Sequence, residues 1–349
     1  MNPQGLNRPF RVIGENIHTT RSVLRTGKLV TTSPAGEEAV RYTTTSGETR
    51  YLPIPEEFKS LQDYREGRVK HVMIAVRTAM SGIEPSSGEA TIYLRTLAEK
   101  QVRAGADFLD LNVDELSWNR EEQKAGIKWL VRAIEPLSPV PLSIDSSSAE
   151  ILWAGIQACA GRAGKPLLNS ASLERIDALD IARDCELPVV VTAAGASGMP
   201  KGTADRVDHA SRMIEAALAR GIAIERLYVD TLVFPISVDN QFVIQCLDAF
   251  RQLRARYGES IHLTGGFSNV SFGMPCRKLI NEVFLNLAAE AGADSAILDP
   301  VTTNLNKVFL ADRQSPSYQL AQRMLLGRDP GCVEYLQAFR EGELEAAAP

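Results

Sequence analysis

Apolar runs of strand length recur along the chain, and most of them end in Asp or Asn. The runs are nearly continuous, as is typical of parallel strands that helices cover on both faces. Segments with apolar residues at helical spacing separate the runs, for example 90–106 and 204–221, where Gly105 and Gly221 are stop signals. The pattern predicts strands at residues 10–16, 108–113, 141–146, 166–171, 188–193, 227–232, 262–268 and 295–300.

Eight strand-plus-helix units in one polypeptide predict the α/β class and a (β/α)8 TIM barrel, with residues 1–349 forming a single domain. A doubly wound sheet is the competing architecture, and it would place fewer strand ends around one pocket. In a closed barrel the carboxyl ends of all strands meet at the face that carries the active site. The polar residues that end the strands then form one ring, which comprises Asp110, Asn112, Asp145, Asn169, Asp230, Asn269 and Asp299.

Residues 17–88 interrupt this alternation after the first strand. Thr, Val and Tyr runs broken by Ser-Pro-Ala-Gly and Ser-Gly predict one or two hairpins, and residues 56–82 then predict helix. Loops on this side of a barrel shape the active site, so we expect the insertion to serve dimerisation or recognition of a partner. At the other end of the chain, residues 340–349 predict a frayed tail.

The composition is that of a soluble globular protein, with 44% hydrophobic and 23% charged residues. A net charge of −5 gives no reason to expect nucleic acid or an anionic membrane as a partner. No apolar stretch reaches the roughly 18 residues of a spanning helix, and the first ten residues lack the features of a secretion signal. These observations predict a cytoplasmic protein.

The cysteines and histidines are too scattered for a metal or disulfide framework. The five cysteines form no CxxC pair, and the four histidines show no HxxxH or HExxH spacing. We therefore expect a reducing environment and no protein-bound metal.

A set of short motifs runs in a fixed order from residue 12 to residue 300. Single members of the set, such as DSSS, are weak signals, but the ordered set is specific. Its members are IGENI, GADFLDLNV, SIDSSSAEIL, LLNSAS, SGMPKGTADR, LYVDTLVFP, GGFSNVSFGMPCRKLINEVFL and GADSAILDP. Through them the chain resembles the pterin-binding methyltransferases, above all the methyltetrahydrofolate:corrinoid methyltransferases and the folate domain of cobalamin-dependent methionine synthase.

The resemblance implies that Asp145, Asn169 and Asp230 bind the pterin ring. The chemistry agrees, because one edge of a reduced pterin presents an exocyclic amine and ring N–H groups, which ionised Asp side chains can accept. An Asn amide can both donate and accept, which suits the neighbouring ring oxygen and nitrogen.

The resemblance also places Asn269 against N5 of methyltetrahydrofolate, where it would hydrogen-bond the N–H that develops as the methyl group leaves. A reduced corrinoid cobalt would be the nucleophile. Because the chain has no DxHxxG signature of a corrinoid-binding domain, we expect a separate corrinoid-binding protein to deliver it. A homodimer is usual in the family.

Further candidate contacts leave alternatives open. Of Asp110 and Asn112, one can face the pocket while the other braces it, and Glu15 can contact substrate or fix the barrel floor. Lys201 is a candidate for the glutamate tail of folate and Arg277 for its benzoyl-glutamate part. Asp145 can instead cap the next helix, and Asp299 can shape a turn. Phe272 stands where the family often has a polar residue.

Two other functions compete with methyl transfer. Dihydropteroate synthase acts on a pterin with the same kind of barrel, but its SxRH-type motif is replaced here by LDPVTTN after the last strand. A non-catalytic folate-binding module is disfavoured by the presence of Asn269. The direction of transfer does not follow from the residues, because both directions cross one transition state.

Overall fold

A computed structural model describes residues 8–344, and its central element is a sheet of eight parallel strands. The strand order is β12, β11, β10, β9, β8, β7, β1, β13, and a parallel bridge from Gly266 to Ile297 joins the two ends of this order. This is the connectivity of a (β/α)8 barrel, which confirms the predicted fold and excludes the doubly wound alternative. The strands are β1 (Arg11–His18), β7 (Phe108–Asn112), β8 (Leu142–Asp145), β9 (Leu167–Ala171), β10 (Val189–Thr192), β11 (Leu227–Asp230), β12 (His262–Thr264) and β13 (Ser295–Leu298).

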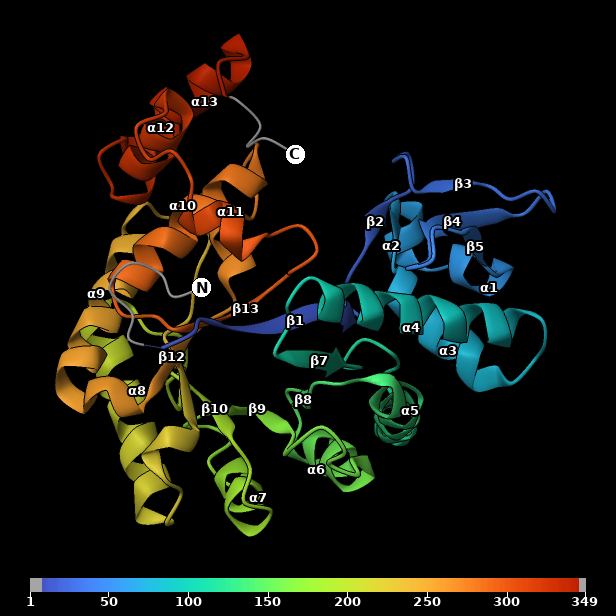
Figure 1. Ribbon diagram of the computed structural model, residues 1–349, viewed down its shortest axis with the longest axis horizontal. Coiled ribbons are helices and arrows are strands. Elements are labelled where there is room, and N and C mark those ends of the chain that lie inside the picture. The colour runs from blue at the N-terminus through green and yellow to red at the C-terminus, as the bar shows by residue number, and fades with distance from the viewer. Residues whose placement is uncertain (1–7, 345–349) are drawn as a thin grey trace. The chain divides into compact units, whose positions relative to one another are not determined.

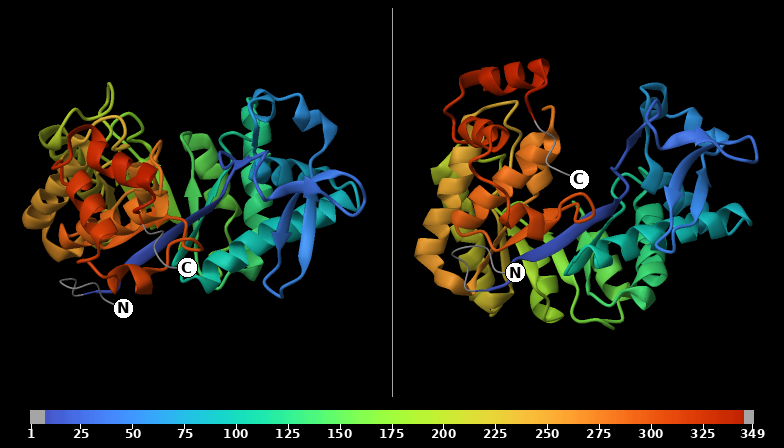
Figure 2. Two further views of the ribbon diagram at one scale, coloured as in Figure 1. Left: turned by 90° about the horizontal axis from the view of Figure 1, so that it is seen from above. Right: turned by 45° about the horizontal axis from the view of Figure 1, so that its top comes forward.

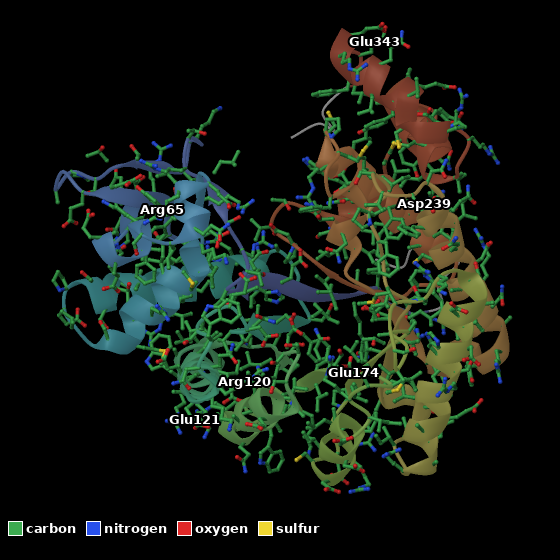
Figure 3. All side chains as sticks on the ribbon, turned by 180° about the vertical axis from the view of Figure 1, so that it is seen from behind. Arg65, Arg120, Glu121, Glu174, Asp239 and Glu343 are labelled. Carbon is green, nitrogen blue, oxygen red and sulfur yellow. The ribbon has the colours of Figure 1, made fainter. Side chains whose placement is uncertain are left out.

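The chain divides into two compact units, one of residues 14–169 and one of the described residues on either side of that range. The single-domain assignment stays a prediction. Within the first unit the main helices are α3 (His71–Ser81), α4 (Ser86–Arg103), α5 (Arg120–Ile134) and α6 (Ala149–Ala158). Asn119 accepts the backbone N–H of Glu121 at 2.9 Å and so caps α5 at its first turn. Arg120 and Glu121, the first two residues of this helix, are labelled in Figure 3.

The insertion in this unit contains two small antiparallel sheets (Figure 1). The three-stranded sheet consists of β3 (Val30–Thr32), β4 (Glu38–Thr43) and β5 (Thr49–Pro53), and the two-stranded sheet of β2 (Val23–Leu24) and β6 (Arg68–Val69). The predicted helix over 56–82 is wrong as one element. It is broken into α1 (Glu56–Lys59), α2 (Gln62–Arg65), β6 and α3, because Gly67 takes a left-handed φ of 84° and the chain then pairs with β2.

The three-stranded sheet lies against α4 (Figure 2). Polar and aromatic side chains join the two. Tyr42 donates to Glu89 at 2.5 Å, and Arg50 forms an ion pair with the same carboxylate. The rings of Tyr42 and Tyr93 meet edge to face with centroids 4.8 Å apart, and the Tyr93 hydroxyl lies 2.8 Å from His71 Nδ1. Burial lowers the pKa of His71 to about 3, and the charge of Arg21 adds to the effect. These contacts pack the insertion against α4 within the same unit.

The second unit carries the remaining helices, and α12 packs on α10. Residues 340 and 341 belong to the last helix, so the prediction of a frayed tail from 340 is wrong at its start, and residues 345–349 lie outside the described residues. No helix in the described part of the chain is long and apolar enough to cross a membrane. The helices are α7 (Ala178–Asp184), α8 (Thr203–Ala219), α9 (Gln241–Tyr257), α10 (Arg277–Glu290), α11 (Leu305–Phe309), α12 (Pro316–Leu325) and α13 (Val333–Glu341).

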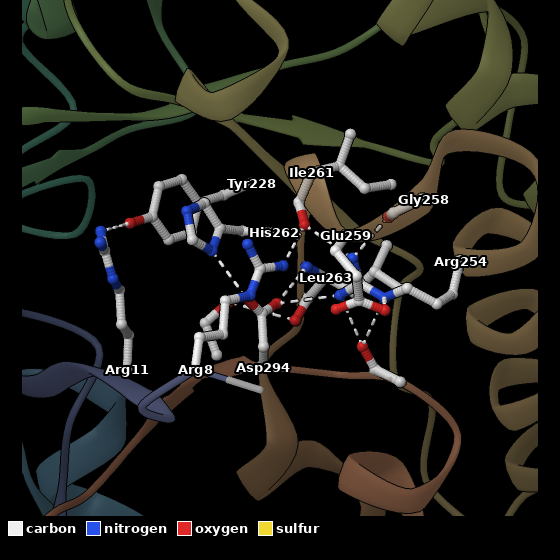
Figure 4. A network of polar contacts seen from close by, with 12 residues as sticks. Arg8, Arg11, Tyr228, Arg254, Gly258, Glu259, Ile261, His262, Leu263 and Asp294 are labelled. Atoms are coloured by element: carbon white, nitrogen blue, oxygen red, sulfur yellow. Dashed lines mark hydrogen bonds and ion pairs between the residues drawn. The ribbon is translucent and has the colours of Figure 1, made fainter. Parts of the chain in front are cut away.

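A buried charge network lies at the amino ends of β12 and β13 in this unit (Figure 4). Asp294, which has no exposed surface, is 2.6 Å from Arg8 Nε and 2.7 Å from His262 Nδ1. It also accepts the backbone N–H of Leu263 at 2.7 Å, and Arg254 lies 3.4 Å away. One carboxylate therefore joins the segment before β1 to two later strands.

Candidate functional site

Three neighbouring strands of the first unit end in polar side chains that lie in one row. Asn112 in β7 is the register partner of Asp145 in β8, which in turn is the partner of Asn169 in β9. The residues that precede them in the three strands are fully buried apolar side chains, Leu111, Ile144 and Leu168. Because side chains alternate along a strand, the apolar and polar residues point to opposite faces.

Asn112 braces Asp145. Its amide donates to Asp145 Oδ2 at 2.9 Å, while its own oxygen accepts the backbone N–H of Asp114 at 2.9 Å. Asp114, not Asp145, accepts the Ser146 hydroxyl and the Ser147 backbone N–H before α6. The helix-cap alternative for Asp145 is therefore not supported, and contact between Asp145 and a pterin stays a prediction.

Asp110 is fully buried behind this row and joins two other side chains. His18 Nε2 lies 2.8 Å from Asp110 Oδ2, and the Asn169 amide nitrogen lies 3.3 Å from Asp110 Oδ1. Asp110 therefore contacts Asn169 directly. Sequence reasoning missed His18, although its place at the carboxyl end of the first strand was a usable signal.

The charged groups of this cluster shift the pKa values of His18 and Asp145. Burial opposes a charged His18, but the hydrogen bond and charge of Asp110, with the charges of Asp145 and Glu15, raise the pKa of His18 to about 9. Burial raises the pKa of Asp145 to about 7, and the Asp110 carboxylate adds to this while His18 and the Asn112 amide oppose it. At neutral pH the cluster therefore contains an imidazolium and a carboxyl group that titrates.

His18, Asp110 and Asp145 also form the one group of possible metal ligands in the described part of the chain, with ligand atoms within 4.8 Å of one another. An imidazolium has no lone pair to give to a metal. Since the pKa of His18 is about 9, its proton would have to be displaced before a metal could bind. The absence of a bound metal stays a prediction.

In the second unit, Asp230 is the last residue of β11. It lies beside Gly265, the residue that follows β12. A Cβ on Gly265 would lie 3.2 Å from Asp230 Oδ1, so the missing side chain gives the carboxylate room. Asp230 accepts the backbone N–H of Leu232 at 2.7 Å. Burial raises the pKa of Asp230 to about 6, against the opposing effects of that N–H and of the charge of Arg206.

Arg206 of α8 is a second residue that sequence reasoning missed, although it ends the SGMPKGTADR motif. Its side chain is fully buried, and its guanidinium lies 4.7 Å from the centre of the Phe234 ring. It donates to the Leu232 carbonyl at 3.3 Å, and two of its nitrogens have no hydrogen-bond partner among the described residues. A buried cation with unmade hydrogen bonds is costly, which points to a functional role.

Asn269 lies on a 3-10 turn, Phe267–Ser271, and its side chain is exposed. The predicted strand over 262–268 is therefore too long, because β12 stops at Thr264 and two glycines follow. A Cβ on Gly266 would lie 3.0 Å from Asn269 Nδ2, so this glycine makes space for the amide. The Gly-Gly pair thus accommodates both Asp230 and Asn269.

Arg277, the first residue of α10, supports this turn. Its guanidinium donates to the Ser268 carbonyl at 2.8 Å and to the Ser271 hydroxyl at 3.0 Å, and lies 5.9 Å from the centre of the exposed Phe272 ring. These contacts hold the turn on both sides of Asn269. Contact between Arg277 and the benzoyl-glutamate of folate stays a prediction.

The remaining predicted site residues are Glu15, Lys201 and Asp299. Glu15 pairs with Arg21 at 3.6 Å, and Lys201 is exposed, with its backbone N–H bonded to Asp205. Asp299 accepts the backbone N–H groups of Val301 and Thr302, which is the turn-shaping role left open above.

Comparisons with known proteins agree on the family. The pattern of pterin binding enzymes matches residues 89–299. The methylcorrinoid:tetrahydrofolate methyltransferase of Eubacterium limosum is 30% identical over 259 residues, which is 72% of this chain and 89% of the relative. The methionine synthase of Mycobacterium tuberculosis is 30% identical over 218 residues. The match covers 58% of this chain and 18% of that enzyme.

Among solved structures, a dihydropteroate synthase of Xanthomonas albilineans in complex with indole-2-carboxylic acid and 6-chloroguanine has a similar fold. Its TM-score is 0.53 at 19% identity, and the match covers 66% of this chain and 87% of that one. At this identity the likeness concerns the barrel and not the reaction.

Proposed function

Since this chain belongs to the pterin-binding enzyme family, we propose that it moves a methyl group between N5 of methyltetrahydrofolate and the cobalt of a corrinoid on a separate protein. The observation that carries the proposal is the match to a methylcorrinoid:tetrahydrofolate methyltransferase over most of both chains. The polar side chains at the strand ends of each unit supply the hydrogen-bond donors and acceptors that the reaction needs.

The pterin would be bound by hydrogen-bond acceptors. Asp145 and Asn169 offer acceptor oxygens to the ring N–H and amino groups, and Asp230 offers a second carboxylate. Each charge-assisted hydrogen bond of this kind contributes about 1.5–3 kcal/mol. Glu15 is a further candidate for the pterin, and Lys201 and Arg277 for the anionic glutamate part of folate.

In the forward direction the N5–methyl bond breaks, its electron pair stays on N5, and N5 takes up a proton while the methyl group goes to the reduced cobalt. Asn269 would hydrogen-bond the N–H that forms at N5. An amide is not a strong acid, so we expect the proton itself to come from water or a neighbouring carboxyl group. The exposed position of Asn269 leaves it open to substrate.

The corrinoid protein is the expected partner, and the insertion is the proposed place for recognising it or for forming a homodimer. Leu24 and Leu29 are exposed there, at 66% and 47% of their surface. Replacing both with Ser keeps the packed contacts to α4. Slower transfer with unchanged folate affinity would support the proposal, whereas loss of folate binding would contradict it.

The test of the function is a titration by calorimetry with methyltetrahydrofolate, tetrahydrofolate and p-aminobenzoate, followed by a transfer assay with reduced free cobalamin. We expect micromolar folate binding, no response to p-aminobenzoate, and formation of methylcobalamin. Binding of p-aminobenzoate would favour a synthase of the dihydropteroate type. Folate binding without transfer to cobalamin or to a corrinoid protein would leave a folate-binding module.

A further inference from the structure

The turn that carries Asn269 has little of its own to fix its shape. It is a single 3-10 turn, Phe267–Ser271, and glycines flank it, Gly265 and Gly266 before it and Gly273 after it. Short 3-10 pieces have poor hydrogen-bond geometry, and glycine permits many backbone conformations. The place of the exposed Asn269 amide must therefore be set by contacts from other elements of the second unit.

Two of these contacts hold the turn itself. Arg277 bonds to Ser268 and Ser271, as described above, and the backbone N–H of Ile236 donates to the Val270 carbonyl at 3.0 Å. The chain that leaves the turn is held by the hydroxyl groups of two further side chains.

Ser237, in the segment that follows β11, supplies the first hydroxyl. Its Oγ donates to the Phe272 carbonyl at 2.7 Å. The next residue, Gly273, has a left-handed φ of 80°, and a Cβ there would lie 3.0 Å from the Ser237 Oγ. The glycine thus adopts a conformation that other residues avoid and leaves room for the hydroxyl.

Tyr335 of α13 supplies the second hydroxyl. Its side chain is fully buried and donates to the Pro275 carbonyl at 3.3 Å, two residues before Arg277. Asp329 accepts two backbone N–H groups of the first turn of α13, at 3.0 Å each, and so fixes this helix. Because α13 lies beyond residues 89–299, its contact with the turn does not follow from the match to pterin binding enzymes.

We propose that Ser237 and Tyr335 are positioning residues for Asn269, which tie down the chain after its turn and so keep the amide in place. This inference rests on the proposed function, since it takes Asn269 to act on the rate of methyl transfer. Both residues act through the backbone of the turn and not on the substrate. Loss of either hydroxyl lets the turn move, which lowers the fraction of molecules with a correctly placed amide.

Ser237→Ala and Tyr335→Phe test the proposal, because each removes one hydroxyl and keeps the rest of the side chain. Single-turnover transfer from saturating methyltetrahydrofolate to reduced free cobalamin should slow by about 3- to 10-fold in each, the effect of one hydrogen bond. The affinity for methyltetrahydrofolate, measured by calorimetry, should change by less than about twofold, since the effect falls on the transition state.

Ser315→Ala and Tyr257→Phe are the matched controls in the same unit. The Ser315 hydroxyl donates to the Asp312 carbonyl at 3.0 Å before α12, and the Tyr257 hydroxyl donates to Glu215 at 3.4 Å at the end of α9. These variants undergo the same chemical change away from the turn, so both should transfer the methyl group at the wild-type rate.

Double variants distinguish positioning from a general effect on the structure. In an Asn269→Ala background, Ser237→Ala and Tyr335→Phe should slow transfer no further, because there is no amide left to position. Slowing by the same factor in both backgrounds would show that the two hydroxyls do not act through Asn269, and would overturn the inference.

Other outcomes separate the inference from the proposed function. Wild-type rates in both single variants, or a loss of folate affinity at an unchanged rate, would overturn the inference alone. A wild-type rate in Asn269→Ala would overturn it as well, with transfer itself still standing. No transfer by the wild type would remove the proposed function. Should Tyr335→Phe not fold, Ser237→Ala and its double variant decide, because Ser237 is exposed.

Discussion

Asp230 accepts the backbone N–H of Leu232 at 2.7 Å, and Leu232 is held with a φ of 64°. A leucine rarely adopts this left-handed conformation, which costs of the order of 1–2 kcal/mol. The Leu232 carbonyl is in turn bonded to the buried guanidinium of Arg206. Arg206 thus helps to hold the strained residue that orients the Asp230 carboxylate.

The first prediction concerns Arg206→Met. We expect pterin affinity to fall by about tenfold or more, because Asp230 loses its fixed orientation and a nearby positive charge. The free energy of unfolding should change little or rise, since a buried cation with two unpaired nitrogens is removed. Calorimetry and urea unfolding measure the two quantities. A parallel loss of stability and affinity would show that Arg206 is only structural.

Asp145→Asn should act on binding. The substitution replaces an acceptor by an amide that offers one acceptor and one donor, so pterin affinity should fall by about 10- to 100-fold while the rate at saturation changes less. Asp248→Asn is the matched control, because Asp248 lies on α9 and pairs with Arg251 of the same helix. Equal effects of the two substitutions would contradict a ligand role for Asp145.

Asn269→Ala should act on the rate. We expect methyl transfer at saturating folate to slow by about 100-fold or more, since a transition-state hydrogen bond is lost. Gly266→Ala should reproduce part of this effect, because its Cβ would lie 3.0 Å from the Asn269 amide nitrogen. Single-turnover kinetics with reduced cobalamin measure both, and Leu310→Ala, at an exposed position after α11, serves as control. Normal rates in Asn269→Ala would remove this residue from the mechanism.

The pH dependence of binding and of transfer should have opposite signs. Asp145 has a pKa of about 7, and only its ionised form accepts two N–H groups, so folate affinity should weaken as pH falls below about 7. Transfer from methyltetrahydrofolate needs a proton at N5, so the single-turnover rate at saturation should rise as pH falls from about 8 to 6. A flat rate profile would argue against protonation during transfer.

Asp294→Ala should destabilise the second unit without a direct effect on the polar clusters. Removing this carboxylate leaves Arg8, His262 and Arg254 without their shared partner, which costs about 3–5 kcal/mol in the free energy of unfolding. Glu174→Ala, at an exposed position between β9 and α7, should cost less than about 0.5 kcal/mol (Figure 3). Urea unfolding distinguishes the two, and similar losses would contradict the importance of the network.

The barrel was predictable because its signals are local. Strand after strand is a short apolar run that ends in Asp or Asn, and the register of Asn112, Asp145 and Asn169 follows once these runs are parallel neighbours. The helix over 56–82 was mispredicted for an equally local reason, because Gly67 and the pairing of β6 with β2 interrupt a helix-forming composition.

By itself, the sequence determined the βα order, the family and the polar residues at the strand ends, since these depend on residue type and on spacing along the chain. The tertiary structure alone decided how those residues are used. It turned the Asn169 amide toward Asp110, assigned Asn112 to brace Asp145, and added His18 and Arg206. The physical reason is that hydrogen-bond direction and buried charge depend on neighbours distant in sequence, which residue patterns do not encode.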